Sequence, residues 1–418
     1  MKHRMISFLV LLVLAGCWAP ARGQDPTLTE TSDGFRATLT RTFDVEPGGT
    51  LTIERVVGSI AVSTWDQNRV EVTETIRLAE DSRSDAQEYV RRHRSTVEQS
   101  GNTVSVRGPD RSPWSGWGRG GNAQHAFEVR LPRAFNADVS TAGGSVNVEG
   151  LQGRVNANTS GGSIRVGGVV GTVRVNTSGG SLSLTDIEGP VEGNTSGGSI
   201  NAERVTGRLD VRTSGGSIRI HDVQADVDAA TAGGSVSVEE VRGAVHARTS
   251  GGDMTLRAID GDARAQTSGG DIDLAGIGGR AEVRTSGGDI EGRALGGPVR
   301  AETSAGDIEL EDVRAGVDAR TSVGDIRVEL TVEDFDADYA TRLATSLPPD
   351  RPATVQAEVR PLYRWDQDDI LSDFPLSRTT PDDDRSSTLR SAGDINGGGP
   401  TIDLRTSGGS IRIRSGSR

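Results

Sequence analysis

The sequence feature that most constrains this chain is one phrase, Thr-Ser-Gly-Gly-Ser/Asp-Ile, which recurs every 18 residues through its middle. A unit this short cannot bury its own apolar face, so its copies must stack on one another. The repeat therefore predicts a solenoid. The eleven copies begin at Thr141, Thr159, Thr177, Thr195, Thr213, Thr231, Thr249, Thr267, Thr285, Thr303 and Thr321.

Counted from its threonine, each copy is mostly apolar at positions 5, 7, 10, 14 and 16, as in Ile164, Val166, Val169, Val173 and Val175. Positions 5 and 7, and positions 14, 16 and the next threonine, alternate with polar residues, which is typical of half-buried strands. We therefore predict an all-β, single-stranded β-solenoid (β-helix) of about eleven 18-residue rungs, with the threonines pointing inward. At ~4.8 Å per rung the rod would be roughly 50 Å long. The pattern leaves its handedness open.

Glycine marks the corner that follows each threonine. Position 3 is glycine in all eleven copies, from Gly144 to Gly324, whereas position 2 also accommodates Ala305 and Val323. We expect the glycine at position 3 to need a positive φ, and the residue at position 2 not to need one. The residues between Phe135 and Phe335 include no aromatic side chain, which fits an interior too thin for rings.

Composition narrows the function classes. The 418-residue chain has a net charge of −13, and Lys2 is its only lysine. An acidic surface of mixed sign makes non-specific binding of nucleic acid unfavourable, so we expect no nucleic-acid partner. The strict period and the β-branched residues argue for an ordered thin core, not for disorder.

The N-terminus indicates export. Lys2 and Arg4 precede an apolar run, residues 5–14, that is too short to span a bilayer and is typical of a signal peptide. Leu14-Ala-Gly-Cys17 resembles a bacterial lipobox, which predicts lipidation of Cys17 and a membrane-anchored lipoprotein of the cell envelope, in the periplasm or at the cell surface. The alternative is an ordinary secretory peptide cut near residues 21–23. Either way, the mature chain would contain no disulfide.

The remaining segments divide the chain into an ordered series. A helix near residues 82–99, with Ser84 and Gln87 as a capping box, and a closing strand at the repeat phrase of Thr406 are expected to cover the open strand edges at the two ends of the rod. We predict a signal peptide at 1–16, a tether at 17–34, an N-terminal β-rich cap at 35–134, solenoid repeats at 135–330, an irregular segment at 331–400 and a closing repeat strand at 401–418.

Two features suggest binding. A glycine-rich loop within the cap carries Trp114 and Trp117, which would contact a sugar or a protein partner; alternatively, both indoles fold back over the cap. Position 4 changes from serine in the first six rungs to aspartate in the last five, namely Asp253, Asp271, Asp289, Asp307 and Asp325. Stacked carboxylates repel, so one hypothesis is that they bind Ca²⁺. The alternative is that each accepts backbone N–H bonds at its corner, near arginines such as Arg248, Arg284 and Arg320.

Catalysis has little support in the sequence. His93, His125, His221 and His246 are scattered, and the chain contains no Gly-x-Ser-x-Gly elbow, phosphate loop or His-Glu-x-x-His motif. We predict no catalytic residues and no cofactor other than the hypothetical Ca²⁺. A polysaccharide-active β-helix enzyme stays as an alternative, because paired acids are sufficient for sugar chemistry.

Several motifs together resemble the bacterial "putative adhesin" family of repetitive β-solenoids, formerly a domain of unknown function. The motifs are Gly48-Gly-Thr-Leu-Thr-Ile53, Trp65-Asp66 followed by Val70-Glu-Val72, the repeat array, Asp373-Phe-Pro-Leu376 and Asn396-Gly-Gly-Gly-Pro400. The resemblance implies a surface-associated β-solenoid and supplies no ligand. We therefore expect a non-catalytic, envelope-attached scaffold, an adhesin or surface spacer, with the membrane and an envelope polysaccharide or another surface protein as partners. A calcium-dependent binding module is the further alternative.

Overall fold

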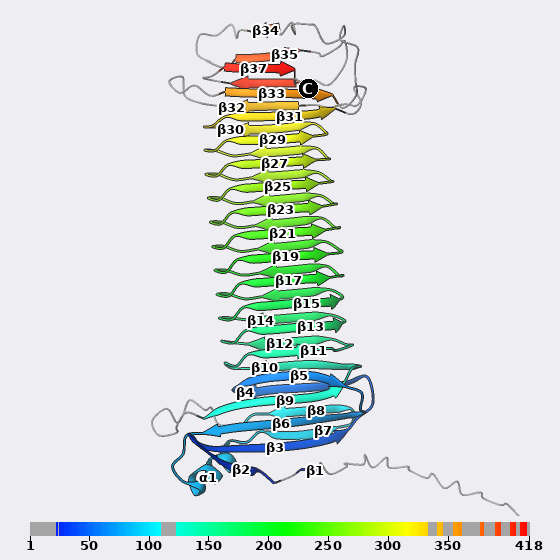
Figure 1. Cartoon of the computed structure of the whole chain (residues 1–418), viewed down its shortest axis with the longest axis vertical. Coiled ribbons are helices and arrows are strands. Elements are labelled where there is room, and N and C mark those ends of the chain that lie inside the picture. Colours follow the sequence, from blue (N-terminus) through cyan, green and yellow to red (C-terminus); the bar gives the residue numbers. More distant parts are fainter. Residues whose placement is uncertain are drawn as a thin grey trace, which may run out of the picture.

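The computed structural model describes residues 25–109 and 123–332, together with the backbone of short strands at 22–23, 341–345, 354–361, 377–379, 389–393, 402–406 and 410–415. In this part of the chain the protein is a rod of stacked rungs with one helix, α1, at its N-terminal end (Figure 1). The predicted all-β solenoid of about eleven repeat rungs is therefore confirmed.

Each repeat contributes one strand to each of two parallel sheets, which we call sheet A and sheet B. Pairing joins equivalent positions of consecutive repeats, for example Ile164 with Leu182 in sheet A and Val173 with Val191 in sheet B. Sheet A contains β11 (Val146–Glu149), β13 (Ile164–Val170), β15 (Leu182–Glu188), β17 (Ile200–Val205), β19 (Ile218–Val223), β21 (Val236–Val241), β23 (Met254–Ile259), β25 (Ile272–Ile277), β27 (Ile290–Leu295), β29 (Ile308–Val313) and β31 (Ile326–Val332). Sheet B contains β10 (Phe135–Thr141), β12 (Val155–Thr159), β14 (Val173–Thr177), β16 (Val191–Asn194), β18 (Leu209–Arg212), β20 (Val227–Ala230), β22 (Val245–Arg248), β24 (Ala263–Gln266), β26 (Ala281–Arg284), β28 (Val299–Glu302) and β30 (Val317–Thr321).

The interior consists of the predicted apolar positions and a column of threonines. In the second rung Ile164, Val166, Val169, Val173 and Val175 are at most 1% exposed. The eleven threonines are 2–7% exposed, which confirms that they point inward. A buried hydroxyl needs hydrogen-bond partners. The repeat supplies them, because each hydroxyl from the second rung onward donates to the carbonyl of the position-3 glycine one rung earlier, at 2.7–3.0 Å.

The position-3 glycines are required by a close approach and not by a left-handed backbone. A Cβ on Gly216 would lie 2.0 Å from the carbonyl oxygen of Gly198 in the preceding rung, which no side chain tolerates. In this column only Gly324 has a positive φ, +153°, so the expectation of φ > 0 is wrong for the other ten. A Cβ on the neighbouring Gly215 would have its nearest atoms at 3.6 Å, which explains why position 2 accepts other residues.

The left-handed conformation occurs at position 9, which the sequence did not indicate. In the first ten rungs, wherever this residue is not glycine, φ lies between 49° and 58°; the residues are Asp186, Arg204, Asp222, Glu240, Ala258, Ala294 and Asp312. An L-residue in this region costs roughly 1–2 kcal/mol. The next residue, at position 10, is buried in every repeat from Leu151 to Val313. The left-handed turn therefore directs an apolar side chain into the interior at the end of each sheet A strand.

The cap continues the solenoid for two rungs and then reverses the strand direction. β4 (Gly49–Val56) and β5 (Ser59–Trp65) pair in parallel with β10 and β11, and β8 (Thr103–Arg107) and β9 (Gln124–Pro132) form the rung beneath them. Sheet A then ends with antiparallel β6 (Arg69–Leu78), β3 (Gly34–Asp44), β2 (Thr27–Thr31) and β1 (Arg22–Gly23), and sheet B with antiparallel β7 (Thr96–Ser100). These strands, not a helix, cover the parallel edge.

The helix is shorter than predicted. α1 spans Arg83–His93 and is capped by Ser82, whose hydroxyl accepts the N–H of Asp85 at 3.2 Å, so the capping box at Ser84 does not form. Residues 96–100 form β7, because Val97 is buried in the core and pairs with Val106. Val97 lies four residues after His93, a spacing that a helix and a following strand both accommodate. The buried side of α1 packs on the face of β3 and β6 through Ala86 and Val90.

At the C-terminal end two more rungs follow the eleventh repeat. β32 (Thr341–Thr345) and β33 (Thr354–Pro361) stack on β30 and β31, and β36 (Ile402–Thr406) and β37 (Ser410–Ser415) stack on them. Thr321 pairs with Thr345, which pairs with Thr406, so the last phrase is in spatial register although it is out of phase in sequence. Residues 331–400 are therefore not irregular throughout. Antiparallel β35 (Leu389–Gly393) and β34 (Ser377–Thr379) then close sheet B.

Candidate functional site

The outward side of sheet B gathers most of the features that a binding site would need. We call it the sheet B face and define it by positions 13, 15 and 17 of each repeat, which alternate with the buried positions 14 and 16. Its arginines are Arg154, Arg174, Arg208, Arg212, Arg248, Arg264, Arg280, Arg284, Arg300 and Arg320. Its acids are Glu192, Asp210, Asp226, Asp228, Asp262, Glu282, Glu302 and Asp318. Because sheet registry repeats every 18 residues, these side chains form columns along the rod.

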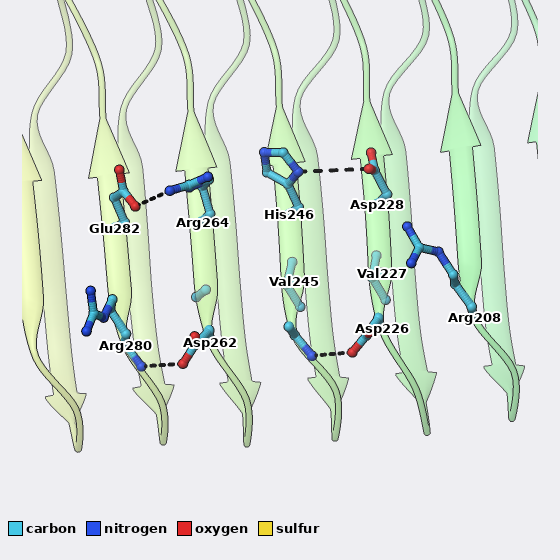
Figure 2. Close-up of a pocket in the computed structure, with 12 residues that line it drawn as sticks. Arg208, Asp226, Val227, Asp228, Val245, His246, Asp262, Arg264, Arg280 and Glu282 are labelled. Atoms are coloured by element: carbon cyan, nitrogen blue, oxygen red, sulfur yellow. Dashed lines mark hydrogen bonds and ion pairs between the residues drawn. The ribbon is translucent and has the colours of Figure 1, made fainter.

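A shallow hollow of about 560 Å³ lies on this face around His246 (Figure 2). Ala244 lines it and presents only a methyl group between Asp226 and Asp262, which occupy the same position in the two neighbouring rungs. Asp226 accepts the N–H of Ala244 at 2.9 Å, and Asp262 accepts that of Arg280 at 2.8 Å, so these two carboxylates are held against the backbone. Figure 2 shows Arg208 and Arg280 on opposite sides of the hollow. Arginine, aspartate, alanine, aspartate and arginine thus follow one another at position 13 across five rungs.

His246 lies in the middle of this hollow. Its Nδ1 is 3.8 Å from Oδ2 of Asp228, and its buried Nε2 has no hydrogen-bond partner among the described residues. Burial lowers the pKa of His246, and the positive charge of Arg248 lowers it further. Both effects favour the neutral form of the ring. Of its two ring nitrogens, Nδ1 faces Asp228 and Nε2 is buried.

A second hollow of about 500 Å³ lies further along the same face, where three arginines converge on one carboxylate. Glu302 accepts from Arg300 at 2.6 Å and from Arg320 at 3.2 Å, and it also binds Arg284. Burial raises the pKa of Glu302, but the hydrogen bonds from Arg284 and Arg300 outweigh this effect and the pKa lies below its ordinary value. Glu302 is therefore an anion that fills part of an arginine cluster. Three exposed serines, Ser286, Ser304 and Ser322, also line this hollow.

The aspartate column at position 4 lies at the corner before sheet A and is exposed. Oδ1 of Asp271 accepts the N–H of Asp289 at 2.9 Å, and the same bond recurs in the neighbouring rungs at 2.7–3.1 Å. Serine does this in earlier rungs, where Ser163 accepts the N–H of Ser181. Arg284 and Arg320 bind Glu302 on the sheet B face. Within the described residues no three His, Cys, Asp or Glu side chains are grouped to hold a metal ion, and calcium binding stays a prediction.

One buried polar cluster in the cap was not visible in the sequence. Glu74, 2% exposed, accepts the N–H of Ser95 at 3.0 Å, its hydroxyl at 3.2 Å, and lies 3.1 Å from Nδ1 of His125. Tyr89 stacks on His93 with ring centroids 4.1 Å apart and lies 6.4 Å from His125. The cluster joins the link after α1 to β6 and β9. Its members meet only through strand pairing, so spacing alone does not reveal it.

The other residues that the sequence suggested do not form a common site in the described part of the chain. His93 and His125 lie in the cap, whereas His221 is on sheet A and His246 on sheet B. Cys17, Trp114 and Trp117 lie outside the described residues, so their predicted roles stay predictions. None of the described helices has the length and apolar character needed to cross a bilayer.

Comparison with known proteins identifies one family. The model of the family described as Toastrack DUF4097 matches residues 59–276, which is more than half of the chain. No match was found among curated proteins. Solved structures with some likeness include a "putative adhesin" from Bacteroides fragilis, with 12% identity, coverage of 77% of this chain and 96% of that one, and a TM-score of 0.19. A "putative lipid binding protein" from Parabacteroides distasonis has 9% identity, coverage of 90% and 96%, and a TM-score of 0.18. A "putative cell adhesion protein" from Clostridium sporogenes has 10% identity, coverage of 68% and 99%, and a TM-score of 0.17. TM-scores this low do not establish a common fold.

Proposed function

This chain belongs to the Toastrack DUF4097 family, and from its architecture we propose that it is a non-catalytic scaffold of the cell envelope, serving as an adhesin or surface spacer. The observation that carries the proposal is the unbroken stack of rungs from the cap to β37. Every rung is joined to the next by backbone hydrogen bonds in two sheets, and the threonine column adds a buried side-chain bond. Such a rod holds its two ends at a fixed separation.

The direction of the rod follows from the predicted anchor. A lipid on Cys17 would lie a few residues before β1, so the cap would face the membrane and the C-terminal rungs would point away from it. The eleven repeat rungs would then project the sheet B face over roughly 50 Å. This arrangement suits a protein that contacts a partner beyond the membrane surface.

The ionisation of the acids on the face supports a non-catalytic role. A general acid needs a raised pKa. The hydrogen bond from Arg264 lowers the pKa of Glu282, and the arginines around Glu302 lower its pKa as well. These carboxylates are thus stable anions in ion pairs, which favours binding over proton transfer to a sugar. The polysaccharide-active alternative would require release of reducing or unsaturated ends from envelope polysaccharide, which a reducing-sugar assay measures.

Two experiments test the scaffold. Membrane fractionation of the wild type and of Cys17→Ser should show the protein moving from the membrane to the soluble exported fraction; an unchanged distribution removes the anchor from the proposal. Deleting residues 213–248, two whole repeats, should preserve the β-rich fold and shorten the rod by about 10 Å in small-angle scattering. Collapse of the fold after this in-phase deletion would contradict a modular rod.

A further inference from the structure

The charges of the rod are divided unequally between its surfaces. Residues 141–329 carry 18 arginines and 27 acids, a net charge of −9. Of these, the sheet B face carries 10 arginines and 8 acids, a net charge of +2. The sheet A side and the two corners carry the other 8 arginines and 19 acids, a net charge of −11. An anionic partner is therefore repelled from every side of the rod except one.

Both hollows described on the rod lie on this same face. The one around His246 has Arg208 and Arg280 at its borders, and neither arginine forms an ion pair with the described residues. The other contains Arg284, Arg300 and Arg320. A guanidinium has five N–H donors, so the one or two bonds that each of these makes to Glu302 or Asp318 leave donors for a ligand. The positive face therefore has recesses lined with available donors.

We propose that the sheet B face binds an anionic polysaccharide that lies along the rod, with its carboxylate or sulfate groups at the arginines of the two hollows. This inference rests on the proposed adhesin or spacer role and names its partner. Arginine recognises carboxylate and sulfate oxygens through paired N–H donors. Sugar hydroxyls need both donors and acceptors, which the face supplies through Asp228 and the serines around the second hollow.

Other polyanions fit this face less well. Single-stranded nucleic acid is bound by aromatic stacking and a strongly basic groove. The repeat rungs contain no Phe, Tyr or Trp, and the sheet B face has a charge of only +2. A lipid surface requires apolar side chains to insert. Among the described residues the large exposed apolar side chains are Val57, Val170 and Val323, and none of them belongs to the sheet B face.

Glu302 provides a sharp test, because it occupies the place of a ligand anion between three arginines. Replacing it with glutamine keeps the shape of the side chain and removes the competing charge. If the arginines bind an external anion, Glu302→Gln should tighten binding. If they serve only to hold Glu302 in the fold, the same substitution should leave binding unchanged or weaken it.

The experiment measures binding of the purified full chain to polygalacturonate, dextran sulfate and neutral dextran by biolayer interferometry. The double variant Arg284→Gln/Arg300→Gln should bind the two anionic polymers roughly tenfold more weakly, and its affinity should depend less steeply on salt, by about two units of log–log slope. The matched control is Arg257→Gln/Arg293→Gln on sheet A, whose arginines are also exposed and ion-paired and should leave binding unchanged. Circular dichroism of each variant confirms its fold.

The outcomes are distinct. Binding of both anionic polymers but not of dextran, with loss confined to the sheet B variant and gain in Glu302→Gln, supports the proposal. No binding to any polymer, equal loss in both double variants, or competition by inorganic phosphate at the same molar charge overturns it. Because the assay uses no membrane, a negative result removes the ligand and leaves the anchored scaffold to be judged by fractionation and scattering.

Discussion

The glycine corner offers the most direct test of how the rungs stack. At the corner of the fifth repeat two glycines, Gly215 and Gly216, are adjacent, and the structure gives them opposite tolerances for a side chain. A Cβ on Gly216 would lie 2.0 Å from the carbonyl oxygen of Gly198, and both atoms belong to backbone that cannot rotate away. The same Gly198 oxygen accepts the hydroxyl of Thr213 at 2.8 Å. Separating the rungs enough to admit a methyl group would therefore also break this buried bond.

The expected cost of Gly216→Ala has two parts. Overpacking costs about 1–3 kcal/mol. Loss of the threonine bond adds ~1–3 kcal/mol, because it leaves a buried carbonyl and hydroxyl without partners. We expect about 2–6 kcal/mol of destabilisation in total. Gly215→Ala is the matched control, since its Cβ would have its nearest atoms at 3.6 Å, in ordinary contact.

Urea denaturation followed by circular dichroism measures the difference between the two variants. Gly215→Ala should unfold close to the wild type, and Gly216→Ala at clearly lower urea. Repeat proteins unfold locally when one interface is weakened, so a second, earlier transition in Gly216→Ala is also expected. Equal midpoints for the two alanine variants would refute the steric account of the constant glycine.

Further predictions concern other columns of the rod. Ala258→Gly should stabilise the protein by up to about 1 kcal/mol in the same urea assay, because Ala258 has a φ of 53° that glycine adopts without strain, whereas Ala263→Gly within β24 should destabilise it. Thr213→Val should cost ~1–3 kcal/mol, since it leaves the carbonyl of Gly198 and the N–H of Gly216 without the hydroxyl they bond to; a neutral result would show that the column is not a structural bond. The folded-state pKa of Glu302 lies below its ordinary 4.5, so its contribution to stability is present above that pH and is lost as the pH falls; thermal melts of Glu302→Gln should show a shallower loss than the wild type in this acid range. Melting with EDTA and then with millimolar Ca²⁺ tests the aspartate column: a raised midpoint with Ca²⁺ would support an ion site, whereas equal midpoints would leave the backbone N–H bonds as its only role.

Features that follow from the 18-residue period could be predicted from the sequence. Features that depend on strand register or on a close contact between rungs could not. Eleven copies of one phrase suffice to predict rungs, inward threonines and the apolar columns, because these follow from stacking alone. The constant glycine at position 3 does not reveal its own cause, because a positive φ and a close approach between rungs both require glycine. The left-handed residues, such as Arg204 and Glu240, share no residue type and so gave no signal.

Part of the candidate site can be predicted from the sequence. Arg264, Glu282 and Arg300 follow one another at intervals of 18 residues. Once the rungs are stacked in register, this spacing predicts neighbouring opposite charges on the sheet B face. The buried contact of Glu74 with His125 was not, because it depends on the antiparallel pairing of β6 with β9. Likewise, the pairing of Thr406 with Thr345 does not follow from the 18-residue period and could not be predicted from it.

The antiparallel strands at the two ends of sheet B bear on how the protein behaves when crowded. A parallel edge invites an identical chain to add its own rung in register, as in amyloid fibrils. Here β7 ends the sheet at one end with a strand of reversed direction. At the other end β35 is reversed relative to β36, and β34, which pairs antiparallel with β35, is only three residues long. The reversed β7 breaks the direction of the ladder at one end, and β34 offers only three residues for pairing at the other, so we expect densely packed copies to remain separate units and not to polymerise through sheet B.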